Sequence, residues 1–175
     1  TQYEAENKKL LLTNIYELIP AELNEKNKRF KFADLDKDFR FERMEDSFSW
    51  LWKAGVVLPV FNTTEPAIPL MVTKKSSLFK LFLSDVGLLT TIYGKATKLM
   101  IVNNEADINK GAIYENVIAQ ELIAHGYSCY YYNNKKLGEL DFVVEHMGKV
   151  LPIEVKSGKE YKKHSALDNV LQKNN

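Results

Sequence analysis

The spacing of apolar residues predicts several helices. Leu11, Ile15 and Leu18 recur at intervals of three or four between residues 7 and 19, which is typical of a helix with one buried face. Pro20 follows directly and is expected to end this helix, because proline cannot donate the next backbone hydrogen bond. Similar spacing predicts further helices over residues 34–39, 40–54, 86–93, 109–125 and 162–171.

Shorter apolar runs bounded by turn-forming residues predict strands. In the run from Val150 to Lys156, Leu151, Ile153 and Val155 fall on one face and the charged Glu154 and Lys156 on the other, and a turn through Gly148 separates it from the preceding run. This pair is expected to form a β-hairpin. The predicted strands are 56–61, 69–72, 79–83, 127–132, 138–145 and 150–156.

The order of these elements predicts an α+β protein with two modules. Residues 1–84 contain helices followed by a hairpin, which indicates a winged-helix-like helical module. Residues 85–175 contain two helices, three strands and a final helix that is still in progress where the sequence stops. Since the sequence also begins at Thr1 rather than at a methionine, we expect it to be a piece of a longer protein.

The composition indicates a folded protein with a buried core, but it does not indicate what the protein binds. The 175 residues are 45% hydrophobic, which is enough for a buried core, and 24 basic residues nearly balance 23 acidic ones. The overall charge therefore gives no argument for nucleic acid or membrane binding. Cys129 is the only cysteine, which excludes an intrachain disulfide, and no apolar run reaches the length of about 20 residues that crosses a membrane. We expect a cytoplasmic protein without a membrane partner.

Three charged residues in the predicted hairpin are candidates for metal binding or catalysis. Glu154 and Lys156 lie two residues apart and should share one face of their strand. Asp141 lies on the preceding strand, and the hairpin should bring its carboxylate beside Glu154. Two carboxylates suit Mg²⁺, with Mn²⁺ as a substitute, when waters and phosphate oxygens complete the coordination. Lys156 could then orient or deprotonate the attacking water, and Glu115 on the preceding helix could add a third carboxylate.

This arrangement resembles the PD-(D/E)XK nuclease superfamily, which has an acid on a helix, an acid on one strand and (D/E)-x-K on the next. The matching residues here are Glu115, Asp141 and Glu154-Val155-Lys156. The resemblance implies a restriction-endonuclease-like α/β core over residues 85–175, truncated at its C-terminal end. It also implies metal ligands at Asp141, Glu154 and Glu115, and catalytic roles for Lys156 and Glu115.

The segments 111–116, 138–142 and 152–158 are more specifically similar to the uncharacterised conserved domain at the C-terminus of prokaryotic AAA-type ATPases. Upstream segments, among them 50–55 and 79–89, extend this similarity over nearly all of the chain. The resemblance implies an ATPase module upstream that binds ATP. The chain itself contains no G-x-x-x-x-G-K-[ST] phosphate-binding loop, so ATP is expected only in that other module.

Several alternatives stay open at this point. The same fold could be a non-catalytic module that binds nucleic acid or a protein partner of the ATPase. The chain could instead be an unrelated α+β scaffold in which Glu154 and Lys156 form a surface ion pair. The basic run of Lys156, Lys159, Lys162 and Lys163 suggests a phosphate-binding surface, but such runs are usually solvated. Trp50 and Trp52 could stack on bases, although their spacing favours packing.

Overall fold

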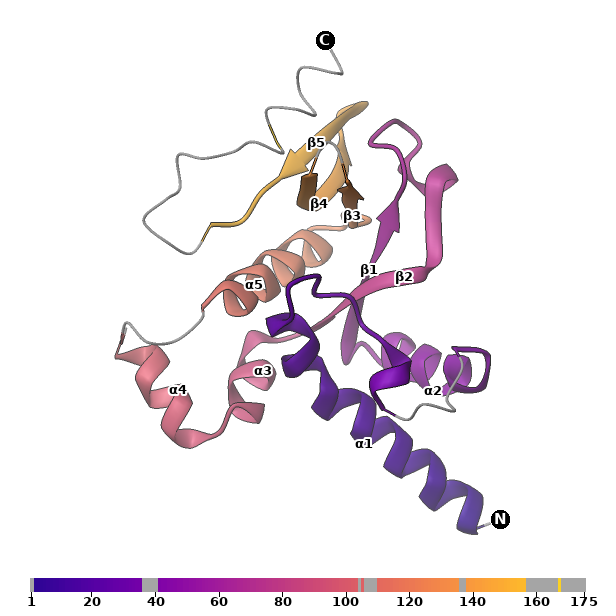
Figure 1. Ribbon diagram of the computed structural model, residues 1–175, viewed down its shortest axis with the longest axis vertical. Helices are drawn as coiled ribbons and strands as arrows, with labels where there is room; N and C mark the ends of the chain where they lie inside the picture. The colour runs from indigo at the N-terminus through magenta and orange to yellow at the C-terminus, as the bar shows by residue number, and fades with distance from the viewer. Residues whose placement is uncertain are drawn as a thin grey trace.

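The chain folds as an α+β protein in the computed structural model (Figure 1). The structure describes residues 2–35, 41–103, 105, 110–135, 138–156 and 167, with side chains except those of residues 2–5 and 41–45. Within these residues there are five α-helices and one open sheet of five strands, both parallel and antiparallel. The predicted α+β class is confirmed.

The α-helices are α1 (Gln2–Asn24), α2 (Phe41–Lys53), α3 (Val86–Ile92), α4 (Lys95–Val102) and α5 (Gly111–Ala124). The strands are β1 (Val57–Thr63), β2 (Lys74–Leu83), β3 (Tyr130–Asn134), β4 (Gly138–His146) and β5 (Lys149–Ile153). Two short 3-10 helices are η1 (Phe32–Asp34) and η2 (Leu70–Thr73).

The sheet has the strand order β2-β1-β3-β4-β5. Strand β1 pairs with β3 in parallel, and the other neighbours are antiparallel. Strands from both sides of the predicted boundary at residues 84 and 85 therefore share one hydrogen-bonded sheet. The division into two modules stays a prediction about how the chain is organised.

The larger hydrophobic core lies between the sheet and the helices. Helix α5 packs against β1 and β2, and α1 packs against β2 and α5 (Figure 1). The Asn116 side-chain amide fixes α5 to β2, because it donates to the Leu83 carbonyl and accepts from the Leu83 amide, both at 2.9 Å. On the other sheet face, Leu70 of η2 covers a smaller buried group that includes Leu140 and Val143. These contacts hold α5 over the sheet.

Several predicted boundaries were wrong. Pro20 lies inside α1, which continues to Asn24, and the Pro20 carbonyl accepts a hydrogen bond from the Asn24 side chain at 2.7 Å. The predicted strand at residues 69–72 is the 3-10 helix η2, in which the Val72 amide donates to the Pro69 carbonyl. Helix α4 was not predicted; none of its side chains is fully buried, although Ile101 packs against the core.

Other predicted elements were placed with small errors. Strand β2 starts five residues before the predicted Phe79, and β3 starts three residues after the predicted Tyr127. Most residues of the predicted helices at 162–171 and 34–39 lie outside the described residues. Trp50 and Trp52 are 51% and 45% exposed, although the Trp52 ring still contacts Phe61.

Among the described residues, no helix is both long and apolar enough to cross a membrane.

Candidate functional site

A β-bulge in β4 determines where Asp141 lies. Tyr130 pairs with Val143 and Tyr132 pairs with Leu140, so the single residue Tyr131 opposes both Asp141 and Phe142. The extra residue interrupts the alternation of side chains along β4. Asp141 and Phe142 consequently both reach the sheet face covered by helices, where Asp141 approaches Lys80 and Phe142 packs on Phe82.

The pairing of β4 with β5 brings Asp141 next to Glu154. The pairing ends at Phe142 opposite Ile153, and Asp141 and Glu154 are the next residue of each segment, with Glu154 already beyond β5. One Asp141 oxygen, Oδ2, accepts a hydrogen bond of 2.8 Å from the Val155 amide, which fixes the carboxylate beside this segment.

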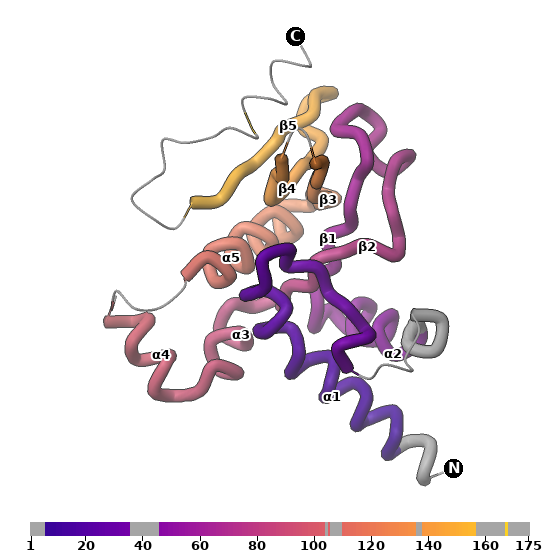
Figure 2. Tube along the Cα trace, in the orientation of Figure 1, coloured from indigo at the N-terminus to yellow at the C-terminus, as the bar shows by residue number. Residues whose placement is uncertain are grey.

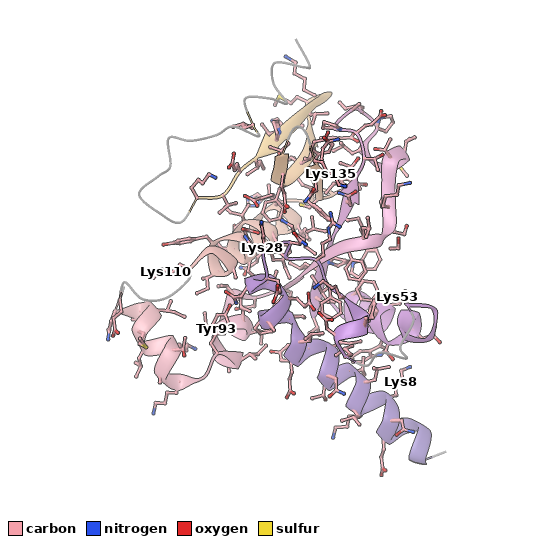
Figure 3. The ribbon with its side chains drawn as sticks, in the orientation of Figure 1. Lys8, Lys28, Lys53, Tyr93, Lys110 and Lys135 are labelled. Carbon is pink, nitrogen blue, oxygen red and sulfur yellow. The ribbon has the colours of Figure 1, made fainter. Side chains whose placement is uncertain are left out.

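Glu115 faces the sheet from the second turn of α5 and is only 3% exposed. Its Oε1 atom forms an ion pair with Lys28, which lies in the turn after α1. Figure 2 shows this turn passing beside α5 before the chain runs on toward β2, and Figure 3 labels Lys28 there. The other oxygen, Oε2, is buried and has no hydrogen-bond partner among the described residues.

Lys80 of β2 connects the acidic residues. Its Nζ atom lies 2.8 Å from Glu139 Oε1, 3.8 Å from Asp141 Oδ1 and 3.9 Å from Glu115 Oε2. The Lys80 side chain is fully buried, and it also approaches the Tyr131 ring. We call Glu115, Glu139 and Asp141 with Lys80 the acid cluster. It joins α5, β2 and β4 at one point.

Burial and neighbouring charges shift the pKa values of Lys80 and Glu115 in the acid cluster. Burial alone would lower the pKa of Lys80, but the nearby carboxylates of Glu115, Glu139 and Asp141 outweigh it and raise that pKa, so Lys80 stays charged. Burial raises the pKa of Glu115, and repulsion from Asp141 adds to this, while Lys80 and Lys28 oppose it. Two lysines therefore balance most of the negative charge of three carboxylates.

Lys156 and Glu154 lie together at the end of β5. Their side chains form an ion pair, with Glu154 10% exposed and Lys156 35% exposed. Lys156 is thus the more accessible of the predicted site residues. The other lysines of the predicted basic run, Lys159, Lys162 and Lys163, lie outside the described residues.

The sequence prediction missed Lys80 and Lys28 and left Glu139 out of the ligand set. A signal for Lys80 was present, because a lysine stands in the otherwise apolar run from Phe79 to Leu83. A charged residue in a strand buried on both faces needs a partner of opposite charge. Nothing in the sequence pattern indicated that Lys28, in a turn, would reach Glu115.

The donor chemistry decides which residues fit a magnesium ion. Among the described residues, no three His, Cys, Asp or Glu side chains are grouped so that they could hold a metal. Glu115 is not gathered with Asp141 and Glu154 as a free ligand, since Lys28 and Lys80 flank its carboxylate. Asp141 and Glu154, each next to the last pair of the β4–β5 ladder, offer two carboxylates, which is the number that Mg²⁺ commonly takes besides water and phosphate. The residues thus fit a two-carboxylate site.

Comparison with family models gives two matches. Residues 1–99 match the family described as "Domain of unknown function (DUF8612)", and residues 110–174 match "Domain of unknown function (DUF4143)". The first match spans more than half of the chain, so the chain belongs to the DUF8612 family. No curated protein and no solved structure matched the chain.

Proposed function

We propose that this member of the DUF8612 family is the nuclease-like C-terminal region of an AAA-type ATPase, and that it hydrolyses phosphodiester bonds of DNA or RNA with Mg²⁺. The observation that carries the proposal is that the Val155 amide holds Asp141 beside the segment of Glu154 and Lys156, with Glu115 joined to Asp141 through Lys80. These are the four residues in which the sequence resembles PD-(D/E)XK nucleases.

The order of helices and strands supports a PD-(D/E)XK core preceded by a winged-helix-like module. Helix α5 followed by β3, β4 and β5 agrees with the helix and three strands expected of a PD-(D/E)XK core. Helices α1 and α2 followed by the antiparallel pair β1 and β2 agree with a winged-helix-like module. Both descriptions are part of the proposal, as is the upstream ATPase module that would bind ATP.

Each residue has a separate role in the proposed reaction. Asp141 and Glu154 would hold Mg²⁺, which when bound supplies a more acidic water and positive charge for the phosphate. Lys156 is 35% exposed and would turn from Glu154 toward a water or a phosphate oxygen, where its ammonium would orient the nucleophile or offset negative charge. Glu115 contributes through Lys80, which it helps to hold beside Asp141.

Cleavage assays on this chain test the proposal. Single- and double-stranded DNA and RNA would be incubated with Mg²⁺ or Mn²⁺. We expect Asp141→Asn and Lys156→Met to lower the rate by about 100-fold or more with folding intact, since each removes a ligand or a charge rather than core volume. Glu121→Gln and Lys149→Met are matched controls at exposed positions. Cleavage that either site variant leaves unchanged contradicts the mechanism.

A second candidate function is favoured by a different observation. Every carboxylate of the site already has a lysine partner: Lys28 for Glu115, Lys80 for Glu139 and Asp141, and Lys156 for Glu154. Such pairing suits a non-catalytic module, in which the carboxylates only stabilise local structure. This module would bind nucleic acid or a protein partner of the ATPase. A titration with Mg²⁺ and Mn²⁺ separates the two functions, because this second one predicts no specific binding at Asp141 and Glu154.

A further inference from the structure

Trp52 of α2 has a half-exposed indole ring that its neighbours hold in place. The side chain is 45% exposed, yet the centre of its ring lies 6.2 Å from that of Phe48, one turn earlier, and 5.7 Å from that of Phe61 in β1. Phe48 and Phe61 are both buried, so they restrict the indole. A ring held in this way loses little conformational freedom when a second flat ring stacks on it.

A lysine lies against the same group of rings. The Nζ atom of Lys74 in β2 is 4.3 Å from the centre of the Phe61 ring, which in turn contacts Trp52. We call Trp52, Phe61 and Lys74 the aromatic–lysine surface. Lys74 is exposed and has no acidic partner among the described residues. Its ammonium is therefore available to an anion from solution.

The elements that form this surface carry few negative charges near it. Strands β1 and β2 contain no acidic residue, and the acidic residues of α2 all precede Ser47. Lys53, which Figure 3 labels, follows Trp52 at the end of α2 and is exposed. A flat ring beside lysines suits a chain of flat bases joined by phosphates, because the bases stack and the phosphates meet positive charge.

The aromatic–lysine surface is separate from the acid cluster. Phe61 opposes Phe79 in the pairing of β1 with β2, and the next residue, Lys80, opposes Val60. Successive side chains of a strand point to opposite faces of the sheet. The Phe61 ring and the Lys80 ammonium therefore lie on opposite faces, and a ligand on Trp52 leaves the acid cluster untouched.

We propose that the aromatic–lysine surface binds single-stranded nucleic acid, with a base stacked on Trp52 and a phosphate on Lys74. The choice of nucleic acid as the occupant rests on the proposed function, whereas this binding needs neither a metal ion nor the acid cluster. A single strand fits better than a duplex, because the bases of a duplex stack on one another and are not free to reach a side chain.

Tryptophan fluorescence tests the stacking, because the chain contains only two tryptophans. Trp50→Phe leaves Trp52 as the reporter. Trp52→Phe leaves Trp50, which is 51% exposed but lies about 200° around the same helix, so it is the matched control. Oligodeoxythymidylate and oligouridylate would be added in EDTA, and the one that acts at the lower concentration indicates whether DNA or RNA is preferred.

We expect both oligonucleotides to quench Trp52 and to leave Trp50 unchanged. If neither quenches Trp52, the proposal is overturned. Equal quenching of Trp52 by a duplex of the same length contradicts the preference for a single strand and likewise overturns it.

A lysine variant of the Trp50→Phe chain tests the phosphate contact. Lys74→Gln should weaken binding and make the fall of log affinity with log salt concentration shallower by about 0.7, as for one phosphate contact on a single strand. Lys98→Gln is the control, since Lys98 is exposed on α4, which Figure 1 shows on the other side of the molecule from α2. Equal salt dependence for Lys74→Gln and Lys98→Gln would overturn the proposal.

The proposed binding and the proposed cleavage fail in different ways. If the oligonucleotides quench Trp52 but are not cleaved with Mg²⁺ or Mn²⁺, the nuclease function is contradicted and the aromatic–lysine surface stands. If the chain cleaves single strands that do not quench Trp52, the aromatic–lysine surface is contradicted and the nuclease function stands.

Discussion

Replacing Glu22 by glutamine should remove a large part of the pH dependence of stability. Glu22 lies in α1 and is only 3% exposed. Burial is the main cause that raises its pKa from 4.5 to about 7, and a hydrogen bond with Asp34 adds to it, while Lys31 acts in the opposite direction. The folded chain therefore binds this proton more tightly than the unfolded chain does.

The raised pKa of Glu22 determines the sign and size of the change in unfolding free energy with pH. A raised carboxyl pKa contributes stability that is complete below about pH 4.5 and is lost as the pH rises through about 7. A shift of about 2.5 pKa units at about 1.4 kcal/mol per unit corresponds to about 3 kcal/mol. Glutamine is neutral at every pH, so Glu22→Gln should lack this loss.

Urea denaturation at a series of pH values measures the prediction. The difference in unfolding free energy between Glu22→Gln and the unmodified chain should change by about 3 kcal/mol between about pH 4.5 and pH 8, in favour of the variant at the higher pH. Glu17→Gln, at an exposed position of the same helix, should follow the unmodified chain. Identical pH profiles for Glu22→Gln and the unmodified chain would refute the reasoning.

Three further predictions concern the core and the contacts that position α5. Asn116→Ala should lower the unfolding free energy by about 2–4 kcal/mol in urea denaturation, because it removes two buried hydrogen bonds to the Leu83 backbone; a loss below about 1 kcal/mol would contradict this role. Phe142→Ala should cost about 3–5 kcal/mol in the same assay, since its fully buried ring packs on Phe82; a small change would mean that the core relaxes around the gap. Burial raises the pKa of Cys129 to about 12, so at about pH 8 the folded chain should react with iodoacetamide roughly a thousandfold more slowly than a free thiol; rapid labelling without unfolding would contradict this burial.

Local patterns predicted much of the fold. The spacing of apolar residues located α1, α2 and α5, and the alternation in 150–156 with the turn at Gly148 located the β4–β5 hairpin. The errors occurred where tertiary contacts outweigh local preference. Ile15, Ile19 and Leu23 are buried on both sides of Pro20, and this packing keeps α1 helical past the proline. Helix η2 is held by the bond from the Leu70 amide to Glu145.

The site could be predicted only in part, for a related reason. Spacing alone placed Glu115 on α5 and Asp141 on β4, whereas Glu154 and Lys156, predicted on the last strand, lie just beyond β5. The contact of Lys80 with Asp141 joins β2 and β4, which are not neighbours in the sheet. It also depends on the bulge in β4, which no sequence pattern predicted. Lys28 lies 87 residues from Glu115 in the chain, so their ion pair could not be inferred from sequence spacing.

The most direct test of the account is a crystal structure of the chain after a manganese soak, with the anomalous density examined between Asp141 and Glu154. The account predicts one Mn²⁺ ion, coordinated by both carboxylates, with Lys156 turned away from Glu154 and Lys80 still between Glu115, Glu139 and Asp141. No anomalous peak, with Lys156 still paired to Glu154, would contradict the proposed metal site and favour the non-catalytic binding module.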